Sequence, residues 1–388
     1  MDYSQILKDL ISIDTSVPPG LNYGEAIDYL QPLFEEVGFK TRKVYVPKEY
    51  AEEREGRVNL LCHHREPEKP RLIFYGHVDV VPAEGWDAFK PWMEGGKIYG
   101  RGATDMKGAI VALLLGLEAL KGKPLKYDTS VMITTDEELS QASQIRYLAQ
   151  FLQPLSGAYV FSLDSSFGYV GIANLGVLQM EIKVKGKSVH SGLSHLGENA
   201  VEKANLLMGA LLDLKNKVVQ RKSAIAVHPA TGLTRMESKL NINKIEGGLK
   251  VNIVPDQCVI SVDRRLIPEE DLEEAEKELL DTLSSVEGVE WEIGEIFRIP
   301  TIPPCQDPIV SELAKIIEEV TGQSGKFGEM GSGDLPYIVT NEWGGKEFGL
   351  GVIRAECNIH GKDEFVYQKD IEDLAEIISR FLSVTENV

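Results

Sequence analysis

Two stretches organise the sequence: Tyr75-Gly76-His77-Val78-Asp79-Val80-Val81-Pro82 and Gly100-Arg101-Gly102-Ala103-Thr104-Asp105-Met106-Lys107-Gly108. The apolar residues 72–75 predict a buried strand that ends at His77. Open α/β sheets bind ligands at the carboxyl ends of such strands. Because side chains two apart on a strand share a face, Asp79 is expected to orient the imidazole of His77 as a metal ligand. Asp105 follows in a glycine-rich loop before a predicted helix, so the first hypothesis is a metal site.

Composition limits the class of protein. The chain has 388 residues, enough for two or three domains, and 43% of them are hydrophobic. Its formal net charge of -19 argues against nucleic acid and anionic membranes as partners. The four cysteines are scattered, without a C-x-x-C pair, which predicts reduced thiols in a cytoplasmic protein. The N-terminus lacks the features of a signal peptide, and the longest apolar run, 109–117, is too short to span a bilayer.

The order of predicted elements indicates an α/β domain with a smaller domain inserted into it. Strands alternate with helices up to Asn174, which predicts a mixed, mostly parallel sheet with helices on both faces. From 175 to 297 the order becomes βαββαβ, the pattern of a ferredoxin-like α+β unit. The helix–strand alternation then resumes. The predicted division is therefore a catalytic domain, 1–174 with 298–388, and an inserted lid or dimerisation domain, 175–297.

Acidic residues and a second histidine recur after later predicted strands. Collected at one edge of the sheet they would supply two imidazoles and three carboxylates: His77, Asp105, Glu138, Asp164 and His360. A mixed nitrogen and oxygen set suits Zn²⁺, with Co²⁺ or Mn²⁺ as substitutes. Five ligands exceed the needs of one open site but suit two metals bridged by a carboxylate. Glu137, next to a ligand, is then the candidate general base. The third glycine of a dinucleotide fingerprint is missing after Gly102, so a Rossmann site is not expected.

With these motifs in order, the chain resembles the zinc-dependent family of acetylornithine deacetylase, succinyl-diaminopimelate desuccinylase, aminoacylase and carboxypeptidase G. The matching segments run from His77-Val78-Asp79 through Asp136-Glu137-Glu138 and Asp164-Ser165-Ser166 to His360. The resemblance implies a zinc-exopeptidase-like catalytic domain that holds two Zn²⁺ per subunit.

The resemblance also implies a role for each site residue. Asp105 would bridge the two metals, with His77 and Asp164 completing one site. Glu138 and His360 would complete the other. Asp79 would orient His77, and Glu137 would be the catalytic base. The peptide between Asp105 and Met106 is expected to be cis.

The inserted domain carries further expected roles. His190, in Gly186-Lys187-Ser188-Val189-His190-Ser191-Gly192, resembles a histidine that in dimeric members reaches into the partner's active site and stabilises the oxyanion. Asn252 and Arg265 resemble positions that bind a substrate carboxylate, although Arg264 is adjacent and either arginine could be a surface charge. Ser332 and Gly333 lie in what looks like the glycine-rich substrate loop. A homodimer acting on a small molecule with a free carboxylate is therefore expected.

The substrate class stays open between two kinds of hydrolase. The preferred reading is hydrolysis of the amide bond of a small N-acyl amino acid, as in the deacetylase and desuccinylase. Asp164 stands where the deacylases usually carry Glu, and no Arg follows Asp334 as it does in several of them. A dipeptidase, aminopeptidase or carboxypeptidase is the alternative. A non-catalytic binding homologue is a remote one, because such a protein would be expected to lose ligands that this chain keeps.

Overall fold

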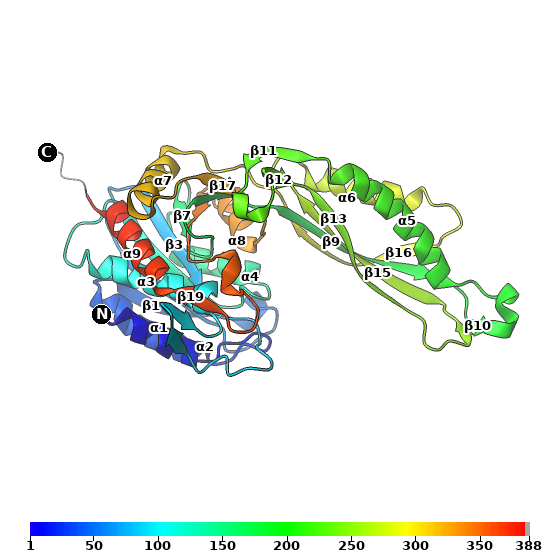
Figure 1. Cartoon of the computed structure of the whole chain (residues 1–388), viewed down its shortest axis with the longest axis horizontal. Coiled ribbons are helices and arrows are strands. Elements are labelled where there is room, and N and C mark those ends of the chain that lie inside the picture. Colours follow the sequence, from blue (N-terminus) through cyan, green and yellow to red (C-terminus); the bar gives the residue numbers. More distant parts are fainter. Residues whose placement is uncertain (385–388) are drawn as a thin grey trace. The chain divides into compact units, whose positions relative to one another are not determined.

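The structure is a computed structural model that describes residues 1–384, and it consists of two compact units (Figure 1). The first unit comprises residues 1–172, 305–327 and the chain from 334 onward, and the second comprises 173–304 and 328–333. The sequence assigned 298–304 and 328–333 to the catalytic domain, whereas here both segments group with the second unit. Segment 328–333 does so through backbone contacts: Glu329 N–H donates to Ala173 O, and Leu175 N–H donates to Gly331 O.

An eight-stranded mixed sheet forms the centre of the first unit. The strands lie in the order β1 (Lys40–Tyr45), β2 (Val58–His64), β6 (Asp128–Thr134), β3 (Arg71–His77), β7 (Tyr159–Ser162), β18 (Lys346–Gly349), β8 (Val170–Ala173) and β17 (Lys326–Gly328). The four central strands, β6, β3, β7 and β18, are parallel, while β1, β2 and β8 pair antiparallel. The predicted α/β class with a parallel core is confirmed.

Helices cover both faces of this sheet. On one face, Phe74, Phe161 and Phe348 from three parallel strands form an aromatic cluster, and Phe381 of α9 (Gln368–Leu382) packs edge-on against Phe161 and Phe348. Helix α3 (Gly108–Glu118) packs against α9 and also against α1 (Tyr3–Ser12), and α7 (Pro308–Thr321) packs against α9. Since α3 is enclosed by these neighbours, it is apolar on almost every side. On the opposite face, α4 (Ala142–Leu148) and α8 (Asp334–Tyr337) pack over the alternate residues of β3 and β6. Helix α2 (Tyr23–Glu36) contacts β1 and β2.

Several short elements were not predicted from the sequence because they span too few residues to show periodicity. Three of them, β19 (Phe365–Tyr367), β5 (Lys97–Tyr99) and β4 (Trp92–Glu94), form a small sheet in that order. The pairing of Phe365 with Tyr99 brings the C-terminal part of the chain beside the loop that carries Asp105. The single-turn elements of this unit are η1 (Lys48–Tyr50), η2 (Ala103–Lys107), η3 (Ala149–Phe151), η6 (Ile338–Glu342) and η7 (Ala355–Cys357).

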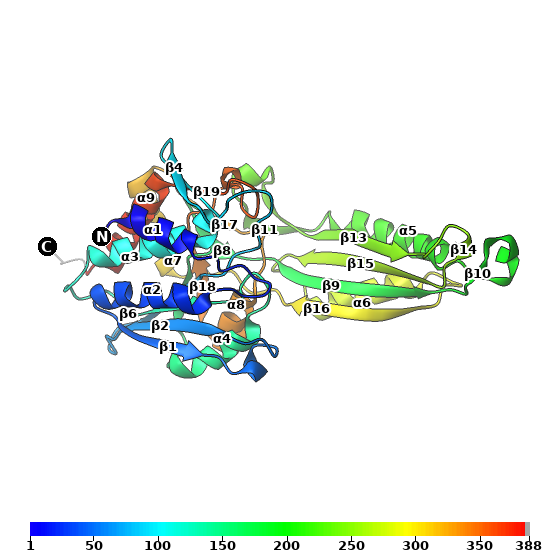
Figure 2. The same cartoon turned by 90° about the horizontal axis from the view of Figure 1, so that it is seen from below.

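The second unit has the predicted βαββαβ order. Its antiparallel sheet runs β13 (Lys239–Gly247), β15 (Gln257–Leu266), β9 (Gly176–Lys185) and β16 (Trp291–Ile299), which is the ferredoxin-like arrangement (Figure 2). Helices α5 (Ala200–Val218) and α6 (Leu272–Ser284) pack on one face through a single apolar core. Smaller elements complete it: β10 (Val189–His190), η4 (Ser191–Leu196), β11 (Lys222–Ala226), η5 (Pro229–Thr231), β12 (Arg235–Glu237) and β14 (Ile253–Val254).

Two features of the chain concern its environment: its cysteines and its most apolar helices. All four cysteines are buried free thiols: Cys62, Cys258, Cys305 and Cys357. Within residues 1–384, no helix has both the length and the apolar character that a bilayer crossing requires.

The close crossing of α3 and α9 gives a stability prediction. A Cβ added at Gly116 would lie 2.8 Å from the backbone oxygen of Ala375, which cannot move without shifting α9. We expect Gly116→Ala to lower the free energy of unfolding by about 1–3 kcal/mol, since overpacking outweighs the gain in helix propensity. The matched control is Gly24→Ala in α2, where a Cβ meets nothing within 4 Å. Equal effects of the two variants in urea denaturation would show that the crossing is not tight.

Candidate metal centre

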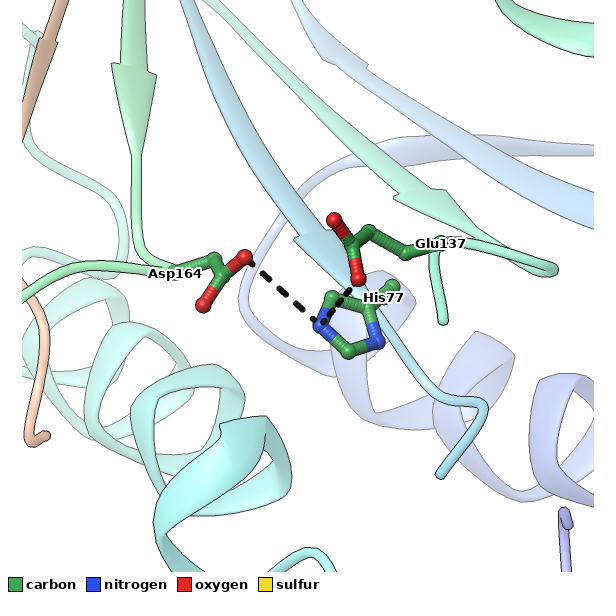
Figure 3. A group of neighbouring side chains, drawn as sticks. All are labelled: His77, Glu137 and Asp164. Atoms are coloured by element: carbon green, nitrogen blue, oxygen red, sulfur yellow. Dashed lines mark ion pairs between the residues drawn. The ribbon is translucent and has the colours of Figure 1, made fainter. Parts of the chain in front are cut away.

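The carboxyl ends of three parallel strands bring candidate ligands to one edge of the sheet. His77 is the last residue of β3, and it lies opposite Thr134, the last residue of β6. The chain after β6 carries Glu137, and the chain after β7 carries Asp164. Figure 3 shows the side chains of His77, Glu137 and Asp164 pointing toward one another from these strand ends. This convergence follows from the parallel pairing, because parallel strands end at the same edge.

Two further candidate ligands come from loops. Asp105 lies in η2, just after β5, and the peptide between Asp105 and Met106 is cis, as the resemblance implied. His360 follows η7 and has a positive φ of 59°, a conformation that residues other than glycine rarely adopt. Such backbone strain clusters at functional sites, where the surrounding structure holds it in place.

Asp105 lies between the two histidines. Its Oδ2 is 3.1 Å from His360 Nε2, and its Oδ1 is 3.4 Å from His77 Nε2. His360 Nε2 is also 3.2 Å from Glu138 Oε2. His77 Nε2 is 3.9 Å from both Glu137 Oε2 and Asp164 Oδ2. All five residues predicted as ligands therefore lie together with Glu137, the predicted base. The ligand atoms of these six residues form two adjoining groups: His77 with Glu137 and Asp164, and Asp105 with Glu138 and His360.

Asp79 connects His77 to the segment after β6. Its Oδ2 accepts a hydrogen bond from the backbone N–H of Glu138 (2.9 Å). His77 Nδ1 lies 3.1 Å from the backbone oxygen of Asp79 and 3.5 Å from its Oδ1. Because a backbone oxygen can only accept, Nδ1 carries a ring proton, and Nε2 is the nitrogen that faces Asp105. Both the backbone oxygen and the carboxylate of Asp79 thus lie near the same ring nitrogen of His77.

The site carries an excess of negative charge. Burial raises the pKa of Glu137 well above its usual value, and the neighbouring carboxylates of Asp164 and Glu138 raise it further. Contacts with Asp105 and Glu138 raise the pKa of His360 to about 10. Burial alone would lower the pKa of His77, but the adjacent carboxylates of Asp105 and Asp79 outweigh it and hold that pKa well above the usual value.

These observations fit a divalent cation. The buried Nε2 of His77 has no hydrogen-bond partner among residues 1–384. Imidazole nitrogens and carboxylate oxygens in this number are the donors that Zn²⁺ and similar metals take. A cation placed among them would satisfy the orphaned nitrogen and offset the repulsion between carboxylates.

Asp136, a residue to which the sequence analysis gave no separate role, anchors the segment that carries Glu137 and Glu138. It is fully buried, with a positive φ of 68°, and its carboxylate accepts four hydrogen bonds. The donors are Tyr23 Oη (2.8 Å), Arg57 Nε (2.8 Å), Arg54 Nε (3.0 Å) and Gln144 Nε2 (2.8 Å). No local pattern marks these donors, because three of the four lie 79 to 113 positions away in the chain.

The predicted residues of the second unit form two separate groups. His190 lies on β10, where its Nδ1 accepts a hydrogen bond from the Gly192 N–H (3.1 Å). The Asn252 backbone oxygen accepts from the Ser191 N–H (3.0 Å), so Asn252 lies beside His190. Arg265 is the last residue but one of β15, whose first residue follows β14, the strand that pairs with β10. The two groups are therefore separated by nearly the full length of a ten-residue strand.

The structure distinguishes the two adjacent arginines. Arg264 is fully buried, and it pairs with Glu270 and donates to a backbone oxygen. Arg265 forms two hydrogen bonds with Asp263 (2.8 and 3.1 Å), and its Nη1 donates to Ser332 Oγ (3.2 Å). Of the pair, only Arg265 has a partly exposed side chain (30%). Gly333 follows Ser332 in segment 328–333.

Known proteins resemble this chain along most of its length. The family model described as Peptidase family M20/M25/M40 matches residues 73–384. A probable succinyl-diaminopimelate desuccinylase of Staphylococcus epidermidis is 28% identical over 336 residues, which cover 80% of this chain and 77% of the relative. A succinyl-diaminopimelate desuccinylase of Marinobacter nauticus is 29% identical over 332 residues, 81% of this chain and 83% of the relative. Among solved structures, an M20 family metallo-carboxypeptidase from Sulfolobus solfataricus superposes with a TM-score of 0.78 at 18% identity, covering 98% of each chain.

The anchoring of Asp136 gives a second stability prediction. We expect Asp136→Asn to lower the free energy of unfolding by about 3–5 kcal/mol, because the variant leaves the buried Arg57 without its counter-charge and removes one of the two carboxylates paired with Arg54. The control is Glu342→Gln, which removes a more exposed pair with Arg146 and should cost less than about 1 kcal/mol. Urea denaturation of both variants measures the difference. A cost for Asp136→Asn no larger than that of the control would contradict the anchoring role.

Proposed function

The chain belongs to peptidase family M20/M25/M40 and is a metallohydrolase, and from this premise we propose that it removes the acyl group from a small N-acyl amino acid. The match over residues 73–384 confirms the resemblance that the sequence motifs predicted. The proposal is supported chiefly by the position of Asp105, whose two carboxylate oxygens face one histidine each. The two desuccinylase relatives support amide-bond cleavage in an N-acyl amino acid.

We assign two Zn²⁺ per subunit, for which Co²⁺ or Mn²⁺ could substitute. Asp105 would bridge the pair, with His77 and Asp164 on one side and Glu138 and His360 on the other. Such cations, when bound, supply positive charge that lowers the pKa of an attacking water and polarises an amide carbonyl. The protein's part is to fix the ligands at a spacing that leaves room for the substrate.

Glu137 is assigned the role of general base. Its side chain is 23% exposed, against 7% for Glu138, so its carboxylate can reach a water and the substrate. It would take a proton from the attacking water and return it to the leaving amine. Glu137 also lies among the donor atoms of the first group, so a ligand role is the competing assignment.

His190 suits the stabilisation of a developing oxyanion. Because its Nδ1 accepts a backbone N–H, the ring proton sits on Nε2, which can then donate. Removing one such donor typically costs about 2.7–4 kcal/mol of transition-state stabilisation. Asn252, beside it, and Arg265, held by Asp263 and Ser332, are proposed to bind the substrate's free carboxylate, with the backbone at Gly333 completing the site. A planar guanidinium fixed by Asp263 is already oriented for such a contact.

We propose that the active form is a homodimer. At about 3.3 Å per residue, the part of β15 that precedes Arg265 separates it from the His190 group by about 26 Å. A small substrate cannot touch both groups of one subunit. If both act on one molecule, His190 and Asn252 come from a second copy of the chain.

The four free thiols support a cytoplasmic location.

The proposed function is tested with a panel of substrates. The Zn²⁺- or Co²⁺-loaded protein should release amino acid from N-succinyl-diaminopimelate or N-acetyl-ornithine, and a chelator should abolish this release. Dipeptides with a free amino terminus form the comparison set. Cleavage of the dipeptides alone would replace the deacylase with a peptidase, and a metal-loaded protein that cleaves nothing would favour the binding homologue.

Substitutions at the adjacent residues Glu137 and Glu138 provide a matched pair of variants for this assay. We expect Glu137→Gln to lower kcat by about 10²–10⁴-fold with metal affinity retained, because it removes only the proton acceptor. Glu138→Gln should instead weaken metal binding, which isothermal titration measures. Loss of metal from Glu137→Gln would show that Glu137 is a ligand and not the base.

The dimer is tested by mixing two inactive variants, His190→Ala and Glu137→Gln. If His190 acts across subunits, a mixed dimer contains one complete site, made of an intact base and the partner's intact histidine. Random pairing in equal amounts makes about half of the dimers mixed, so activity should return to about 25% of the wild-type value. Activity no higher than the mean of the separate variants would place His190 in its own subunit's site and contradict the trans role.

A further inference from the structure

Glu364 is a fully buried carboxylate directly behind the candidate metal centre, and no role has been given to it so far. Its Oε1 accepts hydrogen bonds from the backbone N–H groups of Thr104 (3.0 Å) and Asp105 (3.3 Å). Its Oε2 accepts from the backbone N–H of Gly102 (3.0 Å) and from Arg101 Nη1 (2.6 Å). Four donors from one short loop therefore converge on a single side chain.

The shape of that loop explains why its amides can converge. Gly102 has a φ of 83°, in the left-handed region, and a Cβ there would lie 2.7 Å from Val80 Cγ1. This turn aims the backbone N–H groups of Gly102, Thr104 and Asp105 inward, which makes a concave binding site for an anion. Here the anion is the protein's own Glu364. One of the bound amides belongs to Asp105 itself, so the carboxylate fixes the backbone from which that ligand extends.

Arg101 connects the same carboxylate to the second loop of the site. Its Nη1 binds Glu364, and its Nη2 donates to the backbone oxygen of His360 (3.1 Å). Arg101 is 2% exposed, so this contact is shielded from water. Glu364 follows His360 by four residues and also holds the loop of Asp105. The two loops that carry Asp105 and His360 are thus tied to one buried ion pair.

We propose that Glu364, acting through Arg101, is a positioning residue that holds Asp105 and His360 at the spacing required to bind a cation. This role rests on the proposed metal centre, because those two residues are the ligands that it places. Loop residues otherwise have many accessible conformations, and fixing the ligands before the metal arrives reduces the ordering cost of binding. Partners behind metal ligands typically contribute about 10–100-fold in metal affinity.

The test compares Zn²⁺ affinity with the stability of the metal-free full-length protein. Glu364→Gln keeps the size of the side chain but replaces one acceptor oxygen by an NH₂ group. Because each oxygen of Glu364 accepts from two donors, two of the four donors then lose their acceptor. We expect its Zn²⁺ affinity, measured by competition with a chromogenic chelator, to fall by about 10–100-fold. Arg101→Lys is the second variant, since an ammonium cannot bridge Glu364 and the His360 oxygen as a planar guanidinium does. It should lower the affinity in the same direction and by about 10-fold.

A buried carboxylate at the opposite edge of the same sheet provides the matched control. Asp128, at the start of β6, pairs with Arg71 and Arg65 and accepts the backbone N–H of Glu66. Asp128→Asn should therefore disturb folding stability, measured in urea without metal, while Zn²⁺ affinity stays at the wild-type value. A purely structural role for Glu364 would make its variant behave like this control.

Asp105→Asn separates failure of this inference from failure of the metal centre. Reduced affinity in Asp105→Asn and in the Glu364 and Arg101 variants supports the positioning role. Reduced affinity in Asp105→Asn alone overturns it and leaves the metal centre intact. Wild-type affinity in all three overturns both. If Glu364→Gln does not fold, Arg101→Lys decides the question by the same criteria.

Discussion

The candidate metal centre requires several carboxylates to be held close together against their mutual repulsion. Two unit charges 4 Å apart interact by about 4 kcal/mol at the effective dielectric of a protein surface. Asp105, Glu137, Glu138 and Asp164 face one another around His77 and His360. Flexible chains would relieve this repulsion by moving apart, so the site requires a rigid scaffold. The ends of β3, β6 and β7, locked in register by parallel pairing, supply that rigidity.

Two buried carboxylates lie behind the charged site, one bound by side chains and the other mainly by backbone amides. Behind the segment of Glu137, the carboxylate of Asp136 is fixed by Arg54 and Arg57. Behind the loop of Asp105, the carboxylate of Glu364 gathers backbone amides and Arg101. Buried ion pairs contribute little net stability compared with apolar packing. Their contribution here is geometric, because each one fixes the main chain next to a residue that must face other negative charges.

The second unit holds two candidate substrate-binding groups far apart. Its four-stranded sheet is antiparallel and carries Arg265 near the end of β15. His190 lies on β10, which pairs with β14, the short strand that precedes β15 in the chain. Each side chain is oriented by a residue two positions away: the Gly192 amide sets the tautomer of His190, and Asp263 fixes the guanidinium of Arg265. A sheet of this length separates the two groups too far for one small substrate, which is why the proposed chemistry calls for two copies of the chain.

The sequence by itself determined the parts of this protein that depend on neighbouring residues. The apolar residues 72–75 predicted the strand that ends at His77, and polar residues at and after the strand ends identified His77, Glu137 and Asp164 as candidates. The fold class followed from the order of the elements. Only the tertiary structure revealed that Asp136 and Glu364 support the site and that Arg264 is buried whereas Arg265 is not. Arg101 and Glu364 lie 263 positions apart, and no local periodicity records a hydrogen bond between residues that only folding brings together.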